Sequence, residues 1–294
     1  MSETIANART IRSRRAERGL TLIEMIVVIV ILGILAGFTA MFMVRPVQGY
    51  FDDVRRAALS DLADTSLRRI GRDLRLALPN SVRVDATGSY LEFIPTTAGG
   101  RYRVQAGSAG GDPLDFSAAD TSFDALSGPL TFTNGDQIVV YNLGIPGADA
   151  YSGNTASTDV RRAYNFATGG AGPTSTVRIV STAKLPFDSA GHRFHVVPGS
   201  EQAVTYACEG VGTDANGTGT GQLTRYRAYG FNATQQTTGL GTNASLLANS
   251  ISYCAFTYAA GVTERSGVVG ITLTVTARGD SVRLYHEVHV SNVP

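Results

Sequence analysis

An apolar run near the amino terminus sets the strongest limit on how this 294-residue chain can fold. From Met25 to Val44 it holds 20 consecutive residues, among which Thr39 has the only polar side chain. A helix of that length rises about 30 Å, which is the thickness of the hydrocarbon core of a bilayer. We therefore expect the run to cross a membrane.

The charges before this run predict its orientation. Residues 1–19 contain five arginines and two glutamates, a net charge of +3. Positive residues before a span hold that end in the cytoplasm, so the rest of the chain is expected on the other side. A secretory signal is the alternative, but its apolar region is about 7–15 residues long and ends in a small-x-small cleavage site. The run here is longer and ends in Met41-Phe42-Met43-Val44-Arg45, which favours a retained span.

Glu24 places a carboxylate at the head of the span. A charged side chain at the centre of a membrane helix costs about 2.5–3.5 kcal/mol on insertion scales, and less near the interface. One interpretation puts Glu24 among the headgroups, where it favours the positive end of the helix dipole. The other is that Glu24 awaits a cation inside the membrane, because a buried carboxylate is tolerated when it is paired.

The residues around Glu24 favour the second interpretation. The stretch Arg18-Gly19-Leu20-Thr21-Leu22-Ile23-Glu24-Met25-Ile26 resembles the cleavage and methylation signal of type IV prepilins and pseudopilins. The resemblance implies that a prepilin peptidase cuts after Gly19 and that Leu20, in place of the usual phenylalanine, becomes the methylated amino terminus. It also implies that Glu24, the fifth mature residue, pairs with a terminal amine in the growing filament.

The helix is expected to continue beyond the span. Apolar residues recur at three- and four-residue steps from Val47 to Leu78, opposite a face rich in arginine and aspartate. Pro46 is expected to kink or restart this helix, and Pro79 to end it. These signals divide the chain into a basic leader (1–19), a transmembrane helix with the methylation motif (20–44), an amphipathic continuation (45–79) and a β-rich extracytoplasmic domain (80–294).

After residue 80 the hydrophobic period changes to two, which is typical of strands with one buried face. We predict an α+β fold in which the long amino-terminal helix packs on a mostly antiparallel sheet, as in type IV pilins. Long loops are expected at Ala106–Thr121, Gly144–Gly172 and Glu209–Gly221. The predicted strands are 81–84, 90–94, 101–105, 137–143, 176–181, 193–197, 203–208, 222–229, 251–258, 270–277 and 282–290.

The two cysteines, Cys208 and Cys254, each lie in a predicted strand. Disulfides persist outside the cytoplasm, where this domain is expected. A bond between them would close a loop of about 46 residues and stabilise the fold by about 4 kcal/mol in the chain-entropy account. The alternative is a pair of reduced, buried thiols.

The sequence contains no convincing catalytic or cofactor motif, and we predict neither enzymatic activity nor a metal or cofactor. His286 and His289 are separated by two residues, so on a strand they point to opposite faces; His192 and His195 have the same spacing. His286 shares its face with Leu284 and Val288 and is expected to be a core histidine. The loop from Gly212 to Gly217 lacks the ligand spacing of a calcium-binding EF-hand. The net charge of +1 does not favour nucleic acid.

Three other stretches resemble one branch of the pilin family: Arg45–Tyr50, Leu78–Val84 and Val282–Pro294. They are similar to the MshO minor pilin-like proteins of mannose-sensitive haemagglutinin (MSHA) pili. The resemblance implies a low-copy subunit of the bacterial inner membrane that helps to initiate or cap a pilus. Its implied partners are the prepilin peptidase, other minor and major pilins contacted through the amino-terminal helices, and the inner-membrane assembly platform.

Two other functions remain open on the sequence. The layout is also similar to the J-type minor pseudopilin of type II secretion systems, which shares the signal and the long helix. A membrane-anchored extracytoplasmic binding protein or enzyme is the alternative of another class. Its amino terminus would resemble the signal without being processed.

Overall fold

The computed structural model describes residues 19–294 except 109 and 261–265, and it describes no side chain at 43–45. The leader expected over residues 1–19 therefore lies, apart from Gly19, outside the described residues. The chain divides into two compact units, Met1–Asp53 and Val54–Pro294, which are described separately below.

Helix α1 (Leu22–Arg75) supplies the whole regular structure described in the first unit. Its described side chains from Leu22 to Phe42 are all exposed. The expected kink or restart at Pro46 does not interrupt the helix, which remains continuous through this residue.

In the second unit, α1 buries one stripe of side chains against a sheet. The stripe consists of Leu59, Ala63, Leu67, Ile70 and Leu74, at steps of three or four residues. This spacing places all five side chains on one face of the helix. The helix ends at Arg75, four residues before Pro79, and the backbone N–H of Leu78 then donates to the carbonyl of Ile94 at 2.7 Å.

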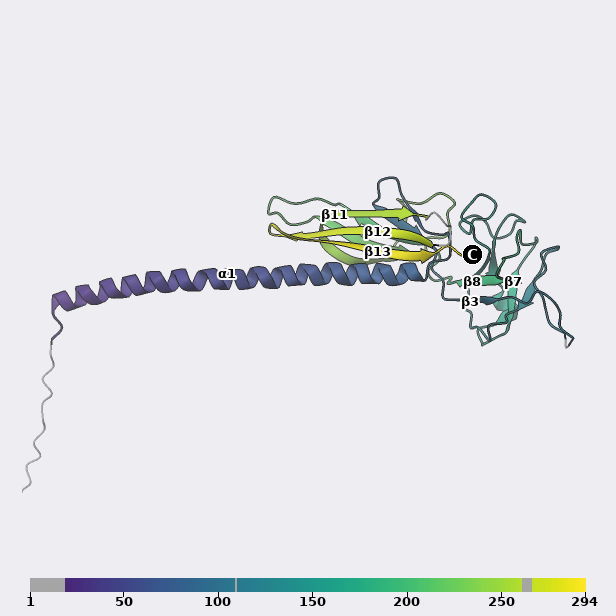
Figure 1. Cartoon of the computed structure of the whole chain (residues 1–294), viewed down its shortest axis with the longest axis horizontal. Helices are drawn as coiled ribbons and strands as arrows, with labels where there is room; N and C mark the ends of the chain where they lie inside the picture. The colour runs from purple at the N-terminus through teal and green to yellow at the C-terminus, as the bar shows by residue number, and fades with distance from the viewer. Residues whose placement is uncertain (1–18, 109, 261–265) are drawn as a thin grey trace, which may run out of the picture. The chain divides into compact units, whose positions relative to one another are not determined.

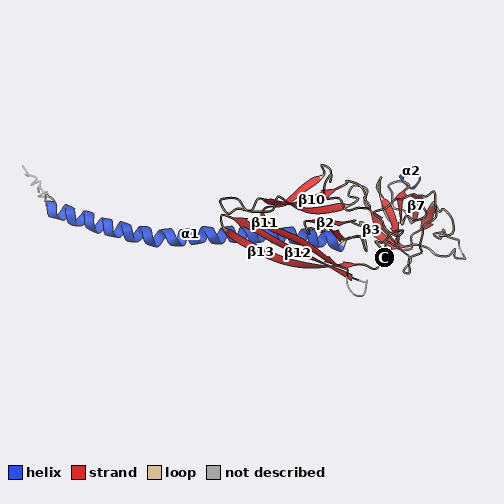
Figure 2. Cartoon of the chain, turned by 90° about the horizontal axis from the view of Figure 1, so that it is seen from above, coloured by secondary structure: helices blue, strands red, loops and turns tan. Residues whose placement is uncertain are grey.

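The sheet beneath α1 has seven strands in the order β1-β2-β9-β10-β11-β12-β13, and all its pairings are antiparallel. Figure 2 shows β11, β12 and β13 crossing the carboxyl-terminal half of α1. The bounds are β1 (Arg83–Val84), β2 (Tyr90–Phe93), β9 (Val204–Glu209), β10 (Gly221–Arg227), β11 (Ala244–Ala259), β12 (Ser266–Ala277) and β13 (Asp280–Ser291).

Strand β11 bends where it passes from one neighbour to the next. Its first half pairs with β10, and from Ile251 onwards it pairs with β12. The register shifts between Ile251 and Tyr253, and Ser250 has a positive φ of 57°. A bulge of this kind bends a strand and strengthens its twist, so the second half of β11 runs beyond the start of β10.

The chain between β2 and β9 builds a second, six-stranded antiparallel sheet in the order β3-β8-β5-β6-β7-β4. Figure 1 draws β7 and β8 in teal, apart from the yellow-green strands of the first sheet. The bounds are β3 (Ala98–Arg101), β4 (Ser122–Asp124), β5 (Gln137–Val140), β6 (Arg161–Tyr164), β7 (Thr176–Val180) and β8 (Arg193–Val197), and the short helix α2 (Phe166–Gly169) follows β6.

Each sheet has its own core. The seven-stranded sheet and α1 share one cluster that includes Phe93, Tyr206 and Leu273. The second sheet encloses an aromatic cluster that includes Phe123 and Phe194. A third cluster contains Leu78 and Ile94 beside β1 and β2 together with Val139 and Val197 of the second sheet, among others, so the two sheets are joined by apolar packing.

The structure confirms the predicted α+β, pilin-like layout of a long helix and antiparallel sheets. It differs in the stretch expected to be a loop at 144–172, which contains β6 and α2, in the strand expected at 101–105, which lies at 98–101 as β3, and in β4, which was not predicted. Strand β6 could not be predicted from a hydrophobic pattern, because it begins with two arginines, Arg161 and Arg162, and both are buried. Their guanidinium groups donate hydrogen bonds to backbone carbonyls rather than to solvent.

Candidate functional site

The predicted processing site lies immediately before α1. Gly19, Leu20 and Thr21 have no regular secondary structure and are exposed. Thr21 caps the helix: its carbonyl accepts from the N–H groups of Glu24 at 3.1 Å and Met25 at 3.2 Å, and its hydroxyl accepts from Glu24 N–H at 3.4 Å. A threonine at this position satisfies donors that the first helical turn leaves free. The Gly19–Leu20 peptide bond is thus outside the helix, in the kind of exposed segment that proteases cleave.

Glu24 lies in the first turn of α1, where the helix dipole favours an anion. The side chain is exposed, and among the described residues nothing donates a hydrogen bond to its carboxylate. The helix that follows is the one helix in the described part of the chain long and apolar enough to cross a membrane. Inside a bilayer, the carboxylate would therefore gain from a cation supplied by another molecule.

Two ion-pair clusters hold α1 on its sheet within the second unit. Asp73 accepts hydrogen bonds from the Tyr206 hydroxyl at 2.8 Å and from Nε of Arg225 at 2.9 Å. Arg225, which is buried, also pairs with Glu201. Burial opposes the charge of Arg225, yet its hydrogen bond to Glu201 and the nearby carboxylates raise its pKa above the usual value.

The second cluster joins the helix to the turn between β12 and β13. Asp280 accepts from Nε of Arg55 at 2.9 Å and from Nη2 of Arg56 at 3.1 Å. The hydrogen bonds from Arg55 and Arg56 lower the pKa of the Asp280 carboxyl. Together the two clusters fix the position of α1 along the sheet.

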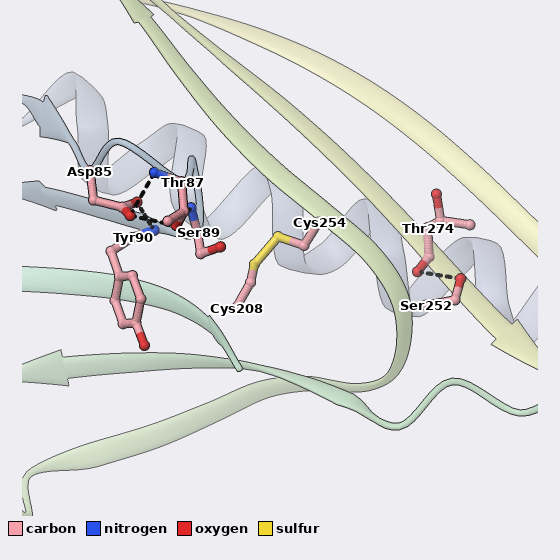
Figure 3. The surroundings of a disulfide bond; sticks show 8 residues. All are labelled: Asp85, Thr87, Ser89, Tyr90, Cys208, Ser252, Cys254 and Thr274. Atoms are coloured by element: carbon pink, nitrogen blue, oxygen red, sulfur yellow. Dashed lines mark hydrogen bonds between the residues drawn. A yellow bond between two sulfur atoms is a disulfide. The ribbon is translucent and has the colours of Figure 1, made fainter. Parts of the chain in front are cut away.

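Cys208 and Cys254 form a disulfide, which confirms the prediction and rules out the reduced pair (Figure 3). The bond joins Cys208 of β9 to Cys254 in the second half of β11, which extends beyond the start of β10. The Cα atoms of the two cysteines are 6.1 Å apart. The turn between β1 and β2 lies against both strands: Ser89 accepts from Cys208 N–H at 2.9 Å, and Gly88 accepts from Phe256 N–H at 2.7 Å.

Gly88 is required in this turn for two reasons. Its φ is +72°, and a Cβ there would lie 3.0 Å from the carbonyl oxygen of Phe256. Asp85 closes the same turn by accepting from the N–H groups of Thr87 and Tyr90 (Figure 3). The disulfide and this turn together tie the curled end of the first sheet.

The histidines are not brought together. On β13, His286 is half-buried and faces Gly71 of α1, whereas His289 is exposed on the opposite face, as the period of two predicts. His195 is largely enclosed on β8, and its Nε2 atom is buried with no hydrogen-bond partner among the described residues. Burial, with a smaller effect of Arg193, lowers the pKa of His195 to about 4.

The other candidate binding features can also be placed. Within the described ranges, no three His, Cys, Asp or Glu side chains are grouped as metal ligands. In the loop from Gly212 to Gly217, the carboxylate of Asp214 accepts from the backbone N–H groups of Asn216 and Thr218 and closes the loop on itself. A groove lined by Arg68, Arg72 and Arg75 of α1 and by His286 was not foreseen from the sequence.

Comparison with known proteins identifies the amino-terminal segment. Residues 14–40 match the family model described as the prokaryotic N-terminal methylation motif. No curated protein and no solved structure matches the chain. The matched segment contains Gly19, Leu20 and Glu24, and it supports a type IV pilin-like or pseudopilin-like protein. The motif implies processing by a prepilin peptidase, and with the apolar helix it is consistent with a single-pass membrane anchor.

Proposed function

We propose that the chain is a minor pilin-like subunit, processed by prepilin peptidase, that helps to initiate or cap a type IV pilus of the MSHA type. The observation that carries the proposal is the methylation motif over residues 14–40, which leads directly into a long apolar helix with Glu24 in its first turn. The exposed apolar side chains of that helix then bundle with the corresponding helices of other minor and major pilins, and the inner-membrane assembly platform receives the subunit.

The size of the extracytoplasmic part supports a low copy number. A second sheet is inserted between β2 and β9, in addition to the sheet that packs on α1. In a densely packed shaft, every copy would have to accommodate this extra sheet. A subunit present in a few copies at one end of a filament has no such constraint, so we place this chain at the tip or the base.

The proposed topology puts the amino terminus in the cytoplasm and the sheets in the periplasm. The arginines of the leader support this orientation through the positive-inside rule. The disulfide supports it independently, because structural disulfides persist in oxidising compartments such as the periplasm.

We further propose that the protein acts through interactions rather than catalysis. Both cysteines are joined in a disulfide, so neither is a free nucleophile, and His286 and His289 point to opposite faces of β13. The J-type pseudopilin of a type II secretion system shares the motif and the layout, and it is the second candidate. A membrane-anchored binding protein or enzyme is the third.

Deletion of the gene distinguishes the pilus function from the secretion function and from a function outside either filament. We expect cells without the chain to lose most surface pili and to regain them when the full-length chain is supplied. An epitope-tagged full-length chain should then appear in sheared pili at a small fraction of the major pilin. Normal piliation combined with lost secretion of hydrolases would assign the chain to a secretion system instead. Normal piliation and normal secretion would contradict both filament roles.

A further inference from the structure

Strand β13 is the longest open sheet edge among the described strands. It has 12 residues and pairs with β12 alone, at the end of the seven-stranded sheet. The opposite edge, β1, has two residues, and the edge strands of the second sheet, β3 and β4, have four and three. Folded proteins usually shorten or cover such edges, because unpaired backbone groups are a template for another strand.

The turn before β13 shows which of its backbone groups face outwards. Arg278 and Gly279 form a two-residue turn with φ values of 52° and 84°, and Ala277 opposes Asp280. In such a hairpin the flanking residues form a hydrogen-bonded pair, and the pattern alternates along the strands. Even-numbered residues of β13 therefore bond to β12, and the odd-numbered ones direct their N–H and C=O groups to the open edge. In the described part of the chain, no backbone partner lies beyond this edge from Arg283 to His289.

A basic groove of about 420 Å³ lies between this strand and α1. Its lining consists of Thr65, Arg68, Gly71, Arg72 and Arg75 of α1 and His286 of β13. Arg68 pairs with Asp64 at 2.7 Å. Arg72 and Arg75 are exposed, and among the described residues neither has a carboxylate partner. The groove therefore presents positive charge beside unpaired backbone.

These two features favour one class of ligand. The open N–H and C=O groups are matched by the backbone of an extended peptide, which is the basis of recognition by strand addition. The arginines add a requirement for acidic side chains. Arg72 and Arg75 are about 4.5 Å apart along the helix axis, and same-face residues of a strand are about 6.7 Å apart, a difference that two long, flexible arginine side chains can span. Two acids at positions i and i+2 can thus each reach an arginine.

A second copy of β13 does not meet this requirement. The side chains that β13 directs towards α1 include Val282, Leu284, His286 and Val288, which bring no carboxylate. Asp280 is acidic, but it already pairs with Arg55 and Arg56. The complementary strand must come from a different chain.

We propose that the edge of β13 and the basic groove together bind an extended acidic segment of another filament subunit, which adds to the sheet as an eighth strand. The inference rests on the proposed function only in taking the partner to be a filament subunit. The added strand hydrogen-bonds to the odd-numbered residues of β13, and its acids on the face towards α1 pair with Arg72 and Arg75.

Binding of a designed peptide tests the charge requirement. The probe is a fluorescein-labelled heptapeptide of alternating valine and glutamate, added to the full-length chain in detergent micelles and followed by fluorescence anisotropy. We expect it to bind, a valine–lysine peptide not to bind, and the Arg72→Glu/Arg75→Glu variant to bind at least tenfold more weakly. Arg69→Glu is the matched control, because Arg69 is exposed on the same helix but does not line the groove.

A proline substitution tests the edge. Tyr285→Pro removes an N–H that points outwards and leaves the ladder to β12 intact, whereas Tyr285→Ala keeps that N–H. We expect at least tenfold weaker peptide binding for the proline variant and less than a twofold change for the alanine variant, with thermal unfolding confirming that both are folded. If the proline variant does not fold, the arginine variants and their control decide the question alone.

Several results would overturn the inference. They are equal binding of the acidic and basic peptides, unchanged affinity in the Arg72→Glu/Arg75→Glu variant, and an equal loss in the Arg69→Glu control. A photo-crosslinker at position 285 in native membranes that gave a product of two copies of this chain would also contradict it. Peptide binding needs neither cleavage at Gly19 nor filament assembly. A failure here would leave the proposed function standing, and a failure of cleavage would leave the groove standing.

Discussion

At the scale of single residues, Arg162 shows how a charge is held inside the second sheet. The side chain is fully buried, and its guanidinium donates to the backbone carbonyls of Ala156, Asp159, Arg161, Ala183 and Lys184. These carbonyls belong to β6 and to the two loops beside it. Arg162 thus replaces an apolar core residue with a network of hydrogen bonds that orders irregular backbone.

Substitution of Arg162 should therefore be costly. Arg162→Met fills part of the space but leaves the five carbonyls, of which those of Asp159 and Arg161 are buried, without this donor, and we expect it to lower the free energy of unfolding by about 3 kcal/mol. Arg178→Met is the control, because Arg178 is exposed on the adjacent strand β7 and should change the free energy by less than about 0.5 kcal/mol. Denaturant unfolding of the full-length chain in detergent measures both. Equal stability of the two variants would contradict this account of β6.

His195 predicts a pH dependence of stability. Its pKa is lowered from 6.5 to about 4 in the folded chain, chiefly by burial. Between these values the unfolded chain binds a proton at His195 that the folded chain does not bind, so the free energy of unfolding falls as the pH falls from about 6.5 to 4. In His195→Gln this loss should be smaller, and in His289→Gln, where the histidine is exposed, it should match the parent. Parallel pH profiles for the parent and His195→Gln would show that the buried imidazole does not contribute.

At the scale of elements, the sequence predicts those helices and strands whose formation depends on a local hydrophobic pattern. The apolar amino-terminal part of α1 follows from an uninterrupted apolar run, and the buried stripe of α1 and the longer strands follow from spacings of 3.6 and 2 residues. Strands β4 and β6 do not. Strand β4 has only three residues, and the two buried arginines of β6 are satisfied by contacts with other segments of the chain. The processing site at Gly19 and Glu24 is contiguous in sequence and could be predicted, although its cleavage stays a prediction. The groove could not, since His286 meets Arg72 only after the sheet has formed.

The disulfide connects elements that are not neighbours in the sheet, since β10 lies between β9 and β11. We expect Cys208→Ala/Cys254→Ala to lower the free energy of unfolding by about 2–4 kcal/mol, because the unfolded chain regains the freedom of a 46-residue loop. Chemical unfolding under oxidising conditions gives the comparison. Addition of a reductant should destabilise the parent and leave the double variant unchanged. A parent insensitive to reductant would mean that the bond does not contribute.

At the scale of the whole molecule, the proposed function assigns Glu24 a role in assembly. Under this proposal, the carboxylate would have a cost in the bilayer, and the terminal ammonium of a partner subunit would offset it. Glu24→Ala should still enter the membrane fraction and resist alkaline extraction, but it should co-purify with the major pilin at least tenfold less than the parent. Glu24→Asp keeps the charge and should retain part of the co-purification. Unchanged recovery of the major pilin with Glu24→Ala would show that the carboxylate has no role in assembly.

The mass of the amino-terminal peptide decides whether the chain is a processed filament subunit, as we propose. The protein is isolated from native membranes of cells with and without prepilin peptidase, digested and analysed by mass spectrometry. We expect a peptide that begins at methylated Leu20 only when the peptidase is present. A peptide that still begins within the arginine-rich leader in both samples would contradict the proposal and would make the apolar helix a plain membrane anchor.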